Sequence, residues 1–401
     1  MRRPPARRTP MGPAWVAVVV AVVLGSLVAG CGPSLRGTVG AERLRAVLER
    51  DLLLLDEQAQ TPELIERLAE FEVLVVGEYH GIEEHDAFVG ELASALHGRG
   101  FRWLLLEFPQ AHTWLLDGYA RGFLDSPGEG AARTYGTLLE RVRSLNATLP
   151  AEAHLRVRAI DVNAGEDDFL PPFRGLLHQL GRPPLLVAAL EALETAPDRE
   201  AELAALAGAL SESEEELRES WGAGAFEAVL DMVDAERRSL LVRRAPAGRE
   251  RDEAREAAMK ALVDRHLARE AGSTLVNVGY YHAQKTRRDG TVGEWLAEHL
   301  VRASPYAQDR TFVLVVVPSR GSMITGGRER SFDVVTDSPP NELFRLMREA
   351  AGDTAAFLVL DDALFRDERV VVNYLPRIDT EPPAAVFDGF VLLHEVRPAR
   401  R

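Results

Sequence analysis

The sequence predicts an α/β fold: a mainly parallel β-sheet flanked by helices, with an α-helical insertion. Three observations support this prediction. Short apolar runs rich in β-branched residues recur along the chain, amphipathic stretches separate them, and one long segment has helical periodicity without a strand candidate. Continuous apolar strands that alternate with helices are typical of a parallel sheet covered on both faces. The composition, 46% hydrophobic and 27% charged residues, is that of a folding globular chain.

The expected elements can be placed in order along the chain. The strand candidates are 72–77, 102–107, 155–161, 274–279, 311–317, 356–360 and 387–393. Helical patterns over 85–97 and 291–300 lie between them. The segment from about 170 to 270 is rich in Ala, Leu, Glu and Arg, and we expect it to form an insertion of three or four helices. The insertion would be either a lid over a substrate or a packing layer, and both roles stay open.

The N-terminal segment has the pattern of a targeting signal. Arginines at positions 2, 3, 7 and 8 precede an uncharged, mostly apolar run at 14–30, which predicts a secretory signal peptide over 1–30. Residues 28–31, Val-Ala-Gly-Cys, resemble the bacterial lipobox, in which the cysteine is lipidated and becomes the new N-terminus. Cys31 is the only cysteine, so we expect it to carry lipid such as palmitate. The alternative is a plain N-terminal membrane anchor.

This signal sets the expected domain organisation and location. Cys31 and a tether would occupy 31–45, and a single α/β domain with the helical insertion would occupy 46–401. A lipid chain holds a protein by burying CH₂ groups in the bilayer, so the domain would stay tethered to a membrane in the bacterial cell envelope. Gly32, rather than an acidic residue, follows the cysteine. This favours the outer membrane, with the domain facing the periplasm.

Charge and missing motifs exclude several classes of function. The formal net charge is −15, whereas binding to a nucleic acid requires clustered cations, so we expect no nucleic-acid partner. A single cysteine leaves no disulfide framework, thiolate zinc site or cysteine nucleophile in the folded part. The chain also lacks the GxSxG, GxxxxGK[ST], HExxH and complete GxGxxG motifs. These absences disfavour the usual serine hydrolases, P-loop enzymes, zincin proteases and nicotinamide enzymes.

Polar residues follow four of the expected strands at their carboxyl ends. Glu78 and His80 follow the first strand, Glu107 ends the second, Asp161 ends the third, and His282 follows the fourth. The carboxyl ends of parallel strands share one crevice, where ligands bind. We therefore expect these five side chains to converge on one candidate site.

The residue types at this site suit proton transfer to or from a water molecule. A neutral imidazole can accept a proton from water, and an adjacent carboxylate fixes its tautomer and stabilises the imidazolium. A carboxylate desolvated among others can become the acid or base itself. His80, Glu107 and His282 are also of the types that bind Mn, Fe or Zn. Water activated by a divalent metal and water activated by histidine alone both remain open.

Further candidates flank these residues. Arg255, on a helical pattern, could hold a substrate carboxylate or an oxyanion, and the alternative is a solvated arginine. Tyr79 and Tyr281 precede the two histidines and could donate hydrogen bonds, line an apolar pocket or ligate iron. His85 lies at the start of the next helix, where it could point into the crevice or out to solvent.

Four segments resemble one superfamily. They read Val-Leu-Val-Val-Gly-Glu-Tyr-His-Gly, Leu-Leu-Leu-Glu, Arg-Glu-Ala-Ala-Met and Val-Gly-Tyr-Tyr-His. They resemble the superfamily that joins erythromycin esterases, ChaN-like haem-binding lipoproteins and Tiki (TraB) proteins, and the resemblance runs from about residue 65 to 300. It implies two Gly-x-x-His turns, a glutamate after the second strand and an arginine on a helix as functional residues. In this chain these are His80 and His282, Glu107 and Arg255, with Glu78 as the acid within the first turn; Asp161 matches an aspartate of the esterase branch.

The resemblance implies two functions. In the preferred one, the protein is a membrane-anchored hydrolase. His80 or His282, oriented by Glu78 and Glu107, activates water for attack on an ester, lactone or amide carbonyl of a small molecule. Arg255 and backbone amides would stabilise the oxyanion.

In the alternative, the protein is a haem- or iron-binding lipoprotein without hydrolase activity. Tyr281 or Tyr79 and His80 or His85 would then lie near the metal. The one-residue gap between Glu78 and His80 resembles the ChaN-like branch, and the long insertion resembles the esterases. A structural lipoprotein with a decayed site is a third hypothesis.

Overall fold

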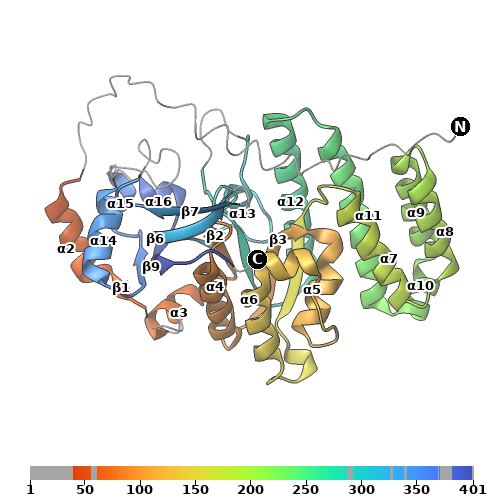
Figure 1. Ribbon diagram of the computed structural model, residues 1–401, viewed down its shortest axis with the longest axis horizontal. Coiled ribbons are helices and arrows are strands. Elements are labelled where there is room, and N and C mark those ends of the chain that lie inside the picture. The colour runs from red at the N-terminus through yellow and green to blue at the C-terminus, as the bar shows by residue number, and fades with distance from the viewer. Residues whose placement is uncertain are drawn as a thin grey trace, which may run out of the picture.

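The computed structural model describes most of the chain (Figure 1). The described residues are 39–55, 61–286, 292–325, 328–337, 341–368, 370 and 382–399. The predicted signal peptide and Cys31 lie outside them. Within the described part, no helix combines the length and the apolar character needed to cross a bilayer.

The core of the structure is a nine-stranded mixed sheet, which confirms the predicted α/β class. The strand order is β1-β8-β9-β6-β2-β5-β3-β4, and β7 pairs with β6. The bounds are β1 Leu53–Leu54, β2 Val73–Glu78, β3 Phe101–Pro109, β4 Arg156–Asp161, β5 Ser273–Gly279, β6 Thr311–Thr325, β7 Arg328–Asp333, β8 Ala356–Val359 and β9 Gly389–Val396. Neighbours from β9 to β4 pair in parallel, whereas β1–β8, β8–β9 and β6–β7 pair antiparallel.

Helices cover both faces of this sheet, because the side chains of its central strands are apolar on both sides. Val73 and Val75 of β2 join one core cluster and Leu74 and Val76 the other. Residues of α2, α12, α13, α14, α15 and α16 pack in the first cluster, and residues of α3, α4, α5 and α6 in the second. The bounds are α2 Ala41–Asp51, α3 Pro62–Leu68, α4 Glu83–His97, α5 Thr113–Ala120, α6 Glu129–Asn146, α13 Leu296–Arg302, α14 Glu342–Ala351, α15 Ala363–Asp367 and α16 Pro383–Val386.

The N-terminal boundary of the folded domain differs from the expectation. Helix α2 begins at Ala41, so 41–45 belong to a helix and not to the tether. Leu44, Val47 and Leu48 of α2 are buried. Their i, i+3, i+4 spacing forms an apolar stripe that packs in the first core cluster.

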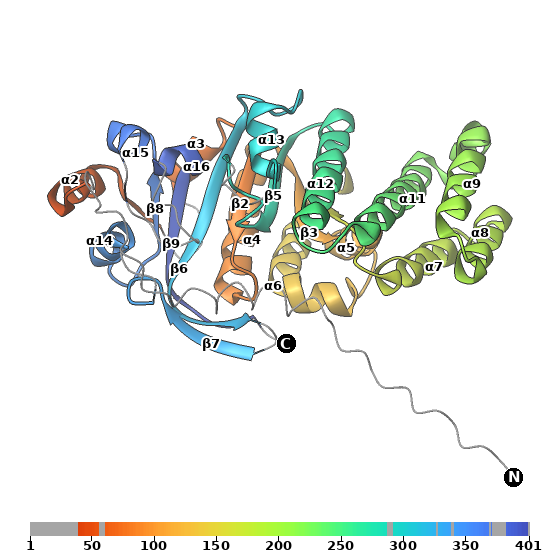
Figure 2. The ribbon, with the colours of Figure 1, turned by 90° about the horizontal axis from the view of Figure 1, so that it is seen from above.

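The helical insertion consists of six helices where three or four were expected. They are α7 Leu170–Gln179, α8 Pro184–Thr195, α9 Arg199–Glu212, α10 Glu214–Trp221, α11 Ala223–Arg244 and α12 Arg249–Arg269. Breaks divide the predicted helical pattern: Gly181 and Gly222 have positive φ, and the Asp198 side chain caps α9. Helices α7–α11 share their own core and lie to one side of the sheet, beyond β3 and α12 in Figure 2.

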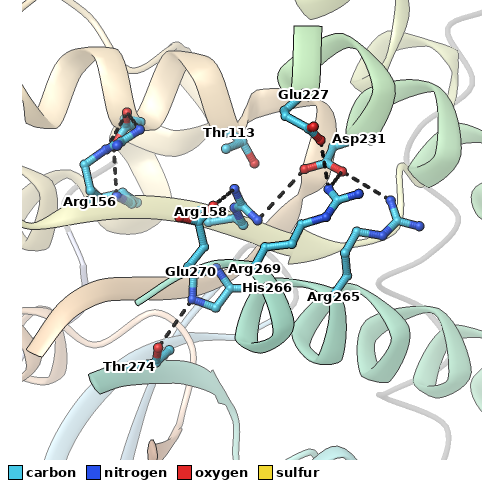
Figure 3. Close-up of polar contacts among 12 residues, drawn as sticks. Thr113, Arg156, Arg158, Glu227, Asp231, Arg265, His266, Arg269, Glu270 and Thr274 are labelled. Atoms are coloured by element: carbon cyan, nitrogen blue, oxygen red, sulfur yellow. Dashed lines mark hydrogen bonds and ion pairs between the residues drawn. The ribbon is translucent and has the colours of Figure 1, made fainter. Parts of the chain in front are cut away.

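A network of ion pairs attaches this insertion to the sheet (Figure 3). Asp231 of α11 is 6% exposed and accepts hydrogen bonds from Arg265 and Arg269 of α12. Arg158 of β4 lies 3.9 Å from the second carboxylate oxygen of Asp231 and also donates to Glu270. The carboxylate of Asp231 thus joins two insertion helices to a sheet strand.

Candidate active site

The topology brings the carboxyl ends of four adjacent strands together. Strands β2, β5, β3 and β4 are neighbours in that order. Glu78, the last residue of β2, is paired in register with Gly279, the last residue of β5. Pro109 of β3 is likewise paired with Asp161 of β4. The predicted site residues at these ends therefore lie along one edge of the sheet.

Glu78 and His80 form a hydrogen-bonded pair just after β2. The Nδ1 of His80 lies 2.9 Å from Oε1 of Glu78. An ionised carboxylate only accepts hydrogen bonds, so His80 carries a proton on Nδ1. Glu78 is buried, whereas the side chain of His80 is 57% exposed. The pair therefore has a buried acid and an imidazole that reaches solvent.

Three further side chains contact the Glu78 carboxylate within the protein. Asn277 donates from Nδ2 to Oε2 over 3.1 Å, and Nε2 of His85 lies 3.1 Å from the same oxygen. The hydroxyl of Tyr135 donates to Oε1 over 3.2 Å. Burial opposes ionisation of Glu78, but the charges and hydrogen bonds of His80 and His85 outweigh it and hold the pKa of Glu78 well below its usual value.

His85 therefore points inward and not to solvent. Its Nε2 is 3.0 Å from the side-chain oxygen Oδ1 of Asn277 and 3.1 Å from Oε2 of Glu78, so this nitrogen carries the proton. The side chain is 2% exposed. His85 thus supports the acid and does not line the accessible surface.

Gly279 allows His80 and Glu107 to meet at one point. A β-carbon on Gly279 would lie 2.9 Å from Nε2 of His80 and 3.2 Å from Oε2 of Glu107. A β-carbon would push the His80 ring away and crowd Glu107, so the absence of a side chain here lets both groups approach the end of β5. The backbone N–H of Gly279 also donates to Oε2 of Glu107 over 2.5 Å. This N–H is consequently occupied and does not face a substrate oxyanion.

Arg255 joins the ends of β3 and β4 to His282. Its Nε and one terminal nitrogen donate to the two oxygens of Asp161 over 2.9 and 2.6 Å. The same terminal nitrogen donates to Oε1 of Glu107 over 2.5 Å, and the other lies 3.4 Å from Nε2 of His282. The guanidinium is a fixed fork of donors, so this arrangement fixes its plane. The solvated alternative for Arg255 is wrong.

His282 lies between two carboxylates. Its Nδ1 is hydrogen-bonded to Oε1 of Glu256, and its Nε2 lies 3.3 Å from Oε1 of Glu107. Burial lowers the pKa of His282, but the charges of Glu107 and Glu256 outweigh this and raise it to about 10. The two carboxylates favour the protonated ring, and the Arg255 nitrogen 3.4 Å from Nε2 is a donor that acts against it.

The pKa of His80 is raised by the same kind of interaction. The protein around its inner edge displaces water and lowers the pKa, but the charge of Glu78 outweighs this, and the pKa rises to about 9. Water at the exposed outer edge screens part of the attraction. The upward direction follows from the direct contact with Glu78.

Four aromatic rings contact one another in succession next to the two histidines. Tyr79 stacks on Tyr280 with ring centroids 4.6 Å apart, and Tyr280 contacts Tyr281 at 4.4 Å. Tyr281 in turn lies 5.9 Å from Trp295, which also contacts the edge of His282. Tyr281 is 37% exposed, so a ligand at the site could reach it.

In the described part of the chain, the metal or haem candidates His80, Glu107, His282 and His85 are all bonded to other side chains. The described residues include no group of three or more His, Cys, Asp or Glu side chains arranged to hold a metal ion. A cation shared by His80, Glu107 and His282 would have to displace Arg255 from Glu107. Haem ligation by His85 would require it to leave Glu78 and Asn277.

Three residues of the site were not singled out from the sequence. Glu256 follows Arg255 directly in the Arg-Glu-Ala-Ala-Met segment, and that adjacency was the available signal. Asn277 interrupts the apolar run Leu-Val-Asn-Val of β5, and this interruption could have been noticed in the sequence. Tyr135 lies on α6, outside every predicted motif, and nothing in the sequence marked it.

Comparison with known proteins shows similarity at the level of the fold. No protein-family model and no curated protein matches the chain. A crystal structure from Bacillus cereus matches 90% of this chain and 99% of its own, with a TM-score of 0.68 and 15% identity. A succinoglycan biosynthesis protein matches 92% of this chain and 100% of its own, with a TM-score of 0.68 and 13% identity.

The enzyme named in the resemblance is also found. A histidine-to-asparagine mutant of the erythromycin esterase EreC, in its open conformation, matches 87% of this chain and 98% of its own. Its TM-score is 0.64 and its identity 13%. ChaN of Campylobacter jejuni with cofacial haem has a TM-score of 0.29 at 12% identity over 67% of this chain. The predicted resemblance is therefore confirmed for the fold, which this chain shares with erythromycin esterase.

Proposed function

We propose that the protein is a hydrolase in which His80 removes a proton from the water that attacks an ester, lactone or amide carbonyl. The observation that supports this proposal is the pairing of a solvent-exposed imidazole with a buried, ionised Glu78. Nδ1 of His80 is engaged, so Nε2 is the nitrogen that accepts the proton from water. Glu78 then stabilises the imidazolium that forms.

Arg255 and His282 supply positive charge for the developing oxyanion. Both are held by carboxylates in geometries fixed before substrate binds. Fixed charges of this kind favour the transition state because they need no reorganisation during the reaction. His282 is buried and has a carboxylate at each ring nitrogen, whereas the outer edge of His80 reaches solvent, so His80 is preferred over His282 as the base.

The reaction balances without a cofactor. Water oxygen bonds to the carbonyl carbon while its proton passes to Nε2 of His80, and the carbonyl oxygen becomes the oxyanion. The tetrahedral intermediate then breaks its bond to the leaving oxygen or nitrogen, which takes the proton from His80. The products are a carboxylic acid and an alcohol or amine, and His80 is neutral again.

The alternative, haem binding, has less support. His85 is hydrogen-bonded to Glu78, and Tyr79 and Tyr281 both pack against the ring of Tyr280. We further propose, from the sequence, that lipid on Cys31 tethers the enzyme to the outer membrane, facing the periplasm. Its partners would then be the membrane and a small-molecule substrate.

The proposal is tested with a panel of aryl and alkyl esters, lactones and amides, assayed with and without a chelator. We expect wild-type hydrolysis that resists chelation and a loss of at least about a hundredfold in kcat/KM for His80→Asn. His178→Asn, on the exposed face of α7, is the matched control and should keep full activity. Retained activity in His80→Asn would refute the mechanism, and a Soret band with added haem but no hydrolysis would favour the alternative.

A further inference from the structure

Helix α6 is interrupted at the residue that reaches the candidate site. Within α6, Tyr135 has non-helical backbone angles, φ −130° and ψ 21°. The segment contains no proline, and Gly136 follows the break directly. The side chain at the break is 1% exposed. A polar side chain buried this completely needs a hydrogen-bond partner, and its contacts indicate its role.

The hydroxyl of Tyr135 contacts two of the strands that carry the site. It donates to Oε1 of Glu78 over 3.2 Å and lies 3.3 Å from the backbone oxygen of Glu107. Oε1 of Glu78 is the same oxygen that accepts the hydrogen bond from His80. The ring also packs edge-on against Phe108, with centroids 6.2 Å apart. The hydroxyl of Tyr135 thus links Glu78, the acid of the Glu78–His80 dyad, to the end of β3.

We propose that Tyr135 is a positioning residue that orients the Glu78 carboxylate and limits how strongly it attracts the proton of His80. The inference rests on the proposed hydrolase function for its catalytic meaning, but its electrostatic part stands without it. A neutral donor on Oε1 spreads the negative charge that His80 would otherwise receive alone. The break in α6 is what allows the hydroxyl to reach that oxygen.

The surroundings keep Tyr135 in the donor form. Burial, and then the charges of Glu78, Glu107 and Asp86, raise the pKa of Tyr135 well above its usual value. The other groups facing the dyad are His85 on α4, which also binds Glu78, and His282, whose charge opposes protonation of His80. None of these groups replaces the contact of Tyr135 with Oε1.

The test is a titration of His80 by NMR in the full chain with ¹³C-labelled histidine, with the signal assigned by its loss in His80→Asn. In Tyr135→Phe the unshared Glu78 charge should raise the pKa of His80 by about half a unit or more. Tyr119→Phe, which removes a hydroxyl outside the site, is the control and should leave that pKa unchanged. An unchanged or lowered pKa of His80 in Tyr135→Phe overturns the proposal.

Kinetics provide a second, independent arm. Tyr135→Phe should lower kcat about tenfold with KM within about twofold, since a hydrogen bond to a charged group is lost. In a Glu78→Gln background the same change should have little further effect, whereas equal losses in both backgrounds would show a merely structural role.

A variant that keeps the ring shape guards against misfolding. If Tyr135→Phe does not fold, Tyr135→3-fluorotyrosine, a stronger donor, should lower the pKa of His80, and a rise would contradict the proposal. A shift in the pKa of His80 without any wild-type hydrolysis would refute the hydrolase function while leaving the electrostatic role of Tyr135 intact.

Discussion

His80 and His282 are both imidazoles beside carboxylates, yet their surroundings give them different protonation roles. His282 has a carboxylate at each ring nitrogen, whereas His80 has one at Nδ1 and is exposed at its outer edge. Groups whose environments differ in this way can serve as acid and base in one site. A base on the solvent side and a fixed cation on the buried side would suit the attack of water on a carbonyl.

The charge of Glu78 should set the pH at which His80 works. His80 must be neutral to accept a proton, so the rate should rise with pH through its pKa of about 9 and then level off. In Glu78→Gln the negative charge that attracts the His80 proton is lost, so the pKa of His80 falls. The rise of kcat/KM with pH, its acid limb, should therefore move to lower pH by about one unit or more. The profile from pH 5 to 10 measures this shift.

A matched carboxylate provides the control for this prediction. Glu84 lies on α4 and pairs with Arg397, so Glu84→Gln should leave the limb in place. An acid limb that does not move in Glu78→Gln would show that His80 is not the group that titrates.

At the residue scale, the sequence predicted which types meet but not how they pair. Strand ends identified Glu78, His80, Glu107, Asp161 and His282, because the topology of a parallel sheet fixes where such ends lie. Arg255 and Glu256 are adjacent on α12, yet Arg255 binds Glu107 and Asp161 whereas Glu256 binds His282. These contacts depend on where α12 lies. That position is set by packing across the insertion, which a local pattern does not encode.

At the scale of elements, the insertion depends on a buried charge for its attachment to the sheet. Replacing Asp231 with Asn leaves Arg158, Arg265 and Arg269 without their common acid. Because these arginines are partly exposed, we expect a loss of about 1–3 kcal/mol in the free energy of unfolding, below the cost of a fully buried pair. Urea unfolding followed by circular dichroism measures the change.

The comparison for this experiment is an ion pair on the surface. Glu214 pairs with Arg218 on α10 and is half exposed, so Glu214→Gln should change the free energy of unfolding by less than about 0.5 kcal/mol. Equal losses in Asp231→Asn and Glu214→Gln would show that the network does not hold the insertion in place.

The elements missed by the sequence share a physical reason. Strand β7 reads Arg-Glu-Arg-Ser-Phe-Asp and is largely exposed, so it has no apolar run to detect. Strand β1 has two residues and forms only by pairing with β8. In contrast, the predicted strands are buried, and their apolar side chains alone indicated them. A buried strand can be predicted from the sequence because its side chains are apolar. A strand that forms only by pairing at a sheet edge lacks that pattern.

At the scale of the whole molecule, the order of strands decides which turns can share a site. The turns after β2 and β5 come from distant parts of the chain, yet these strands are direct neighbours. The sequence predicted a shared carboxyl edge but not this adjacency, which depends on long-range pairing. Adjacency is what lets Gly279 lie against both His80 and Glu107.

The attachment of the whole molecule to a membrane is the remaining prediction. If Cys31 is lipidated, cells given labelled palmitate should incorporate it into the wild-type chain and not into Cys31→Ser, and the mature protein should lack residues 1–30 by mass. Each buried CH₂ contributes about 0.8 kcal/mol, so more than one acyl chain gives stable anchoring. Because Cys31 is not one of the candidate site residues, kcat/KM in detergent should be equal for the wild type and Cys31→Ser. Label in Cys31→Ser, or a wild-type chain that keeps residues 1–30 without label, would instead indicate a plain N-terminal anchor.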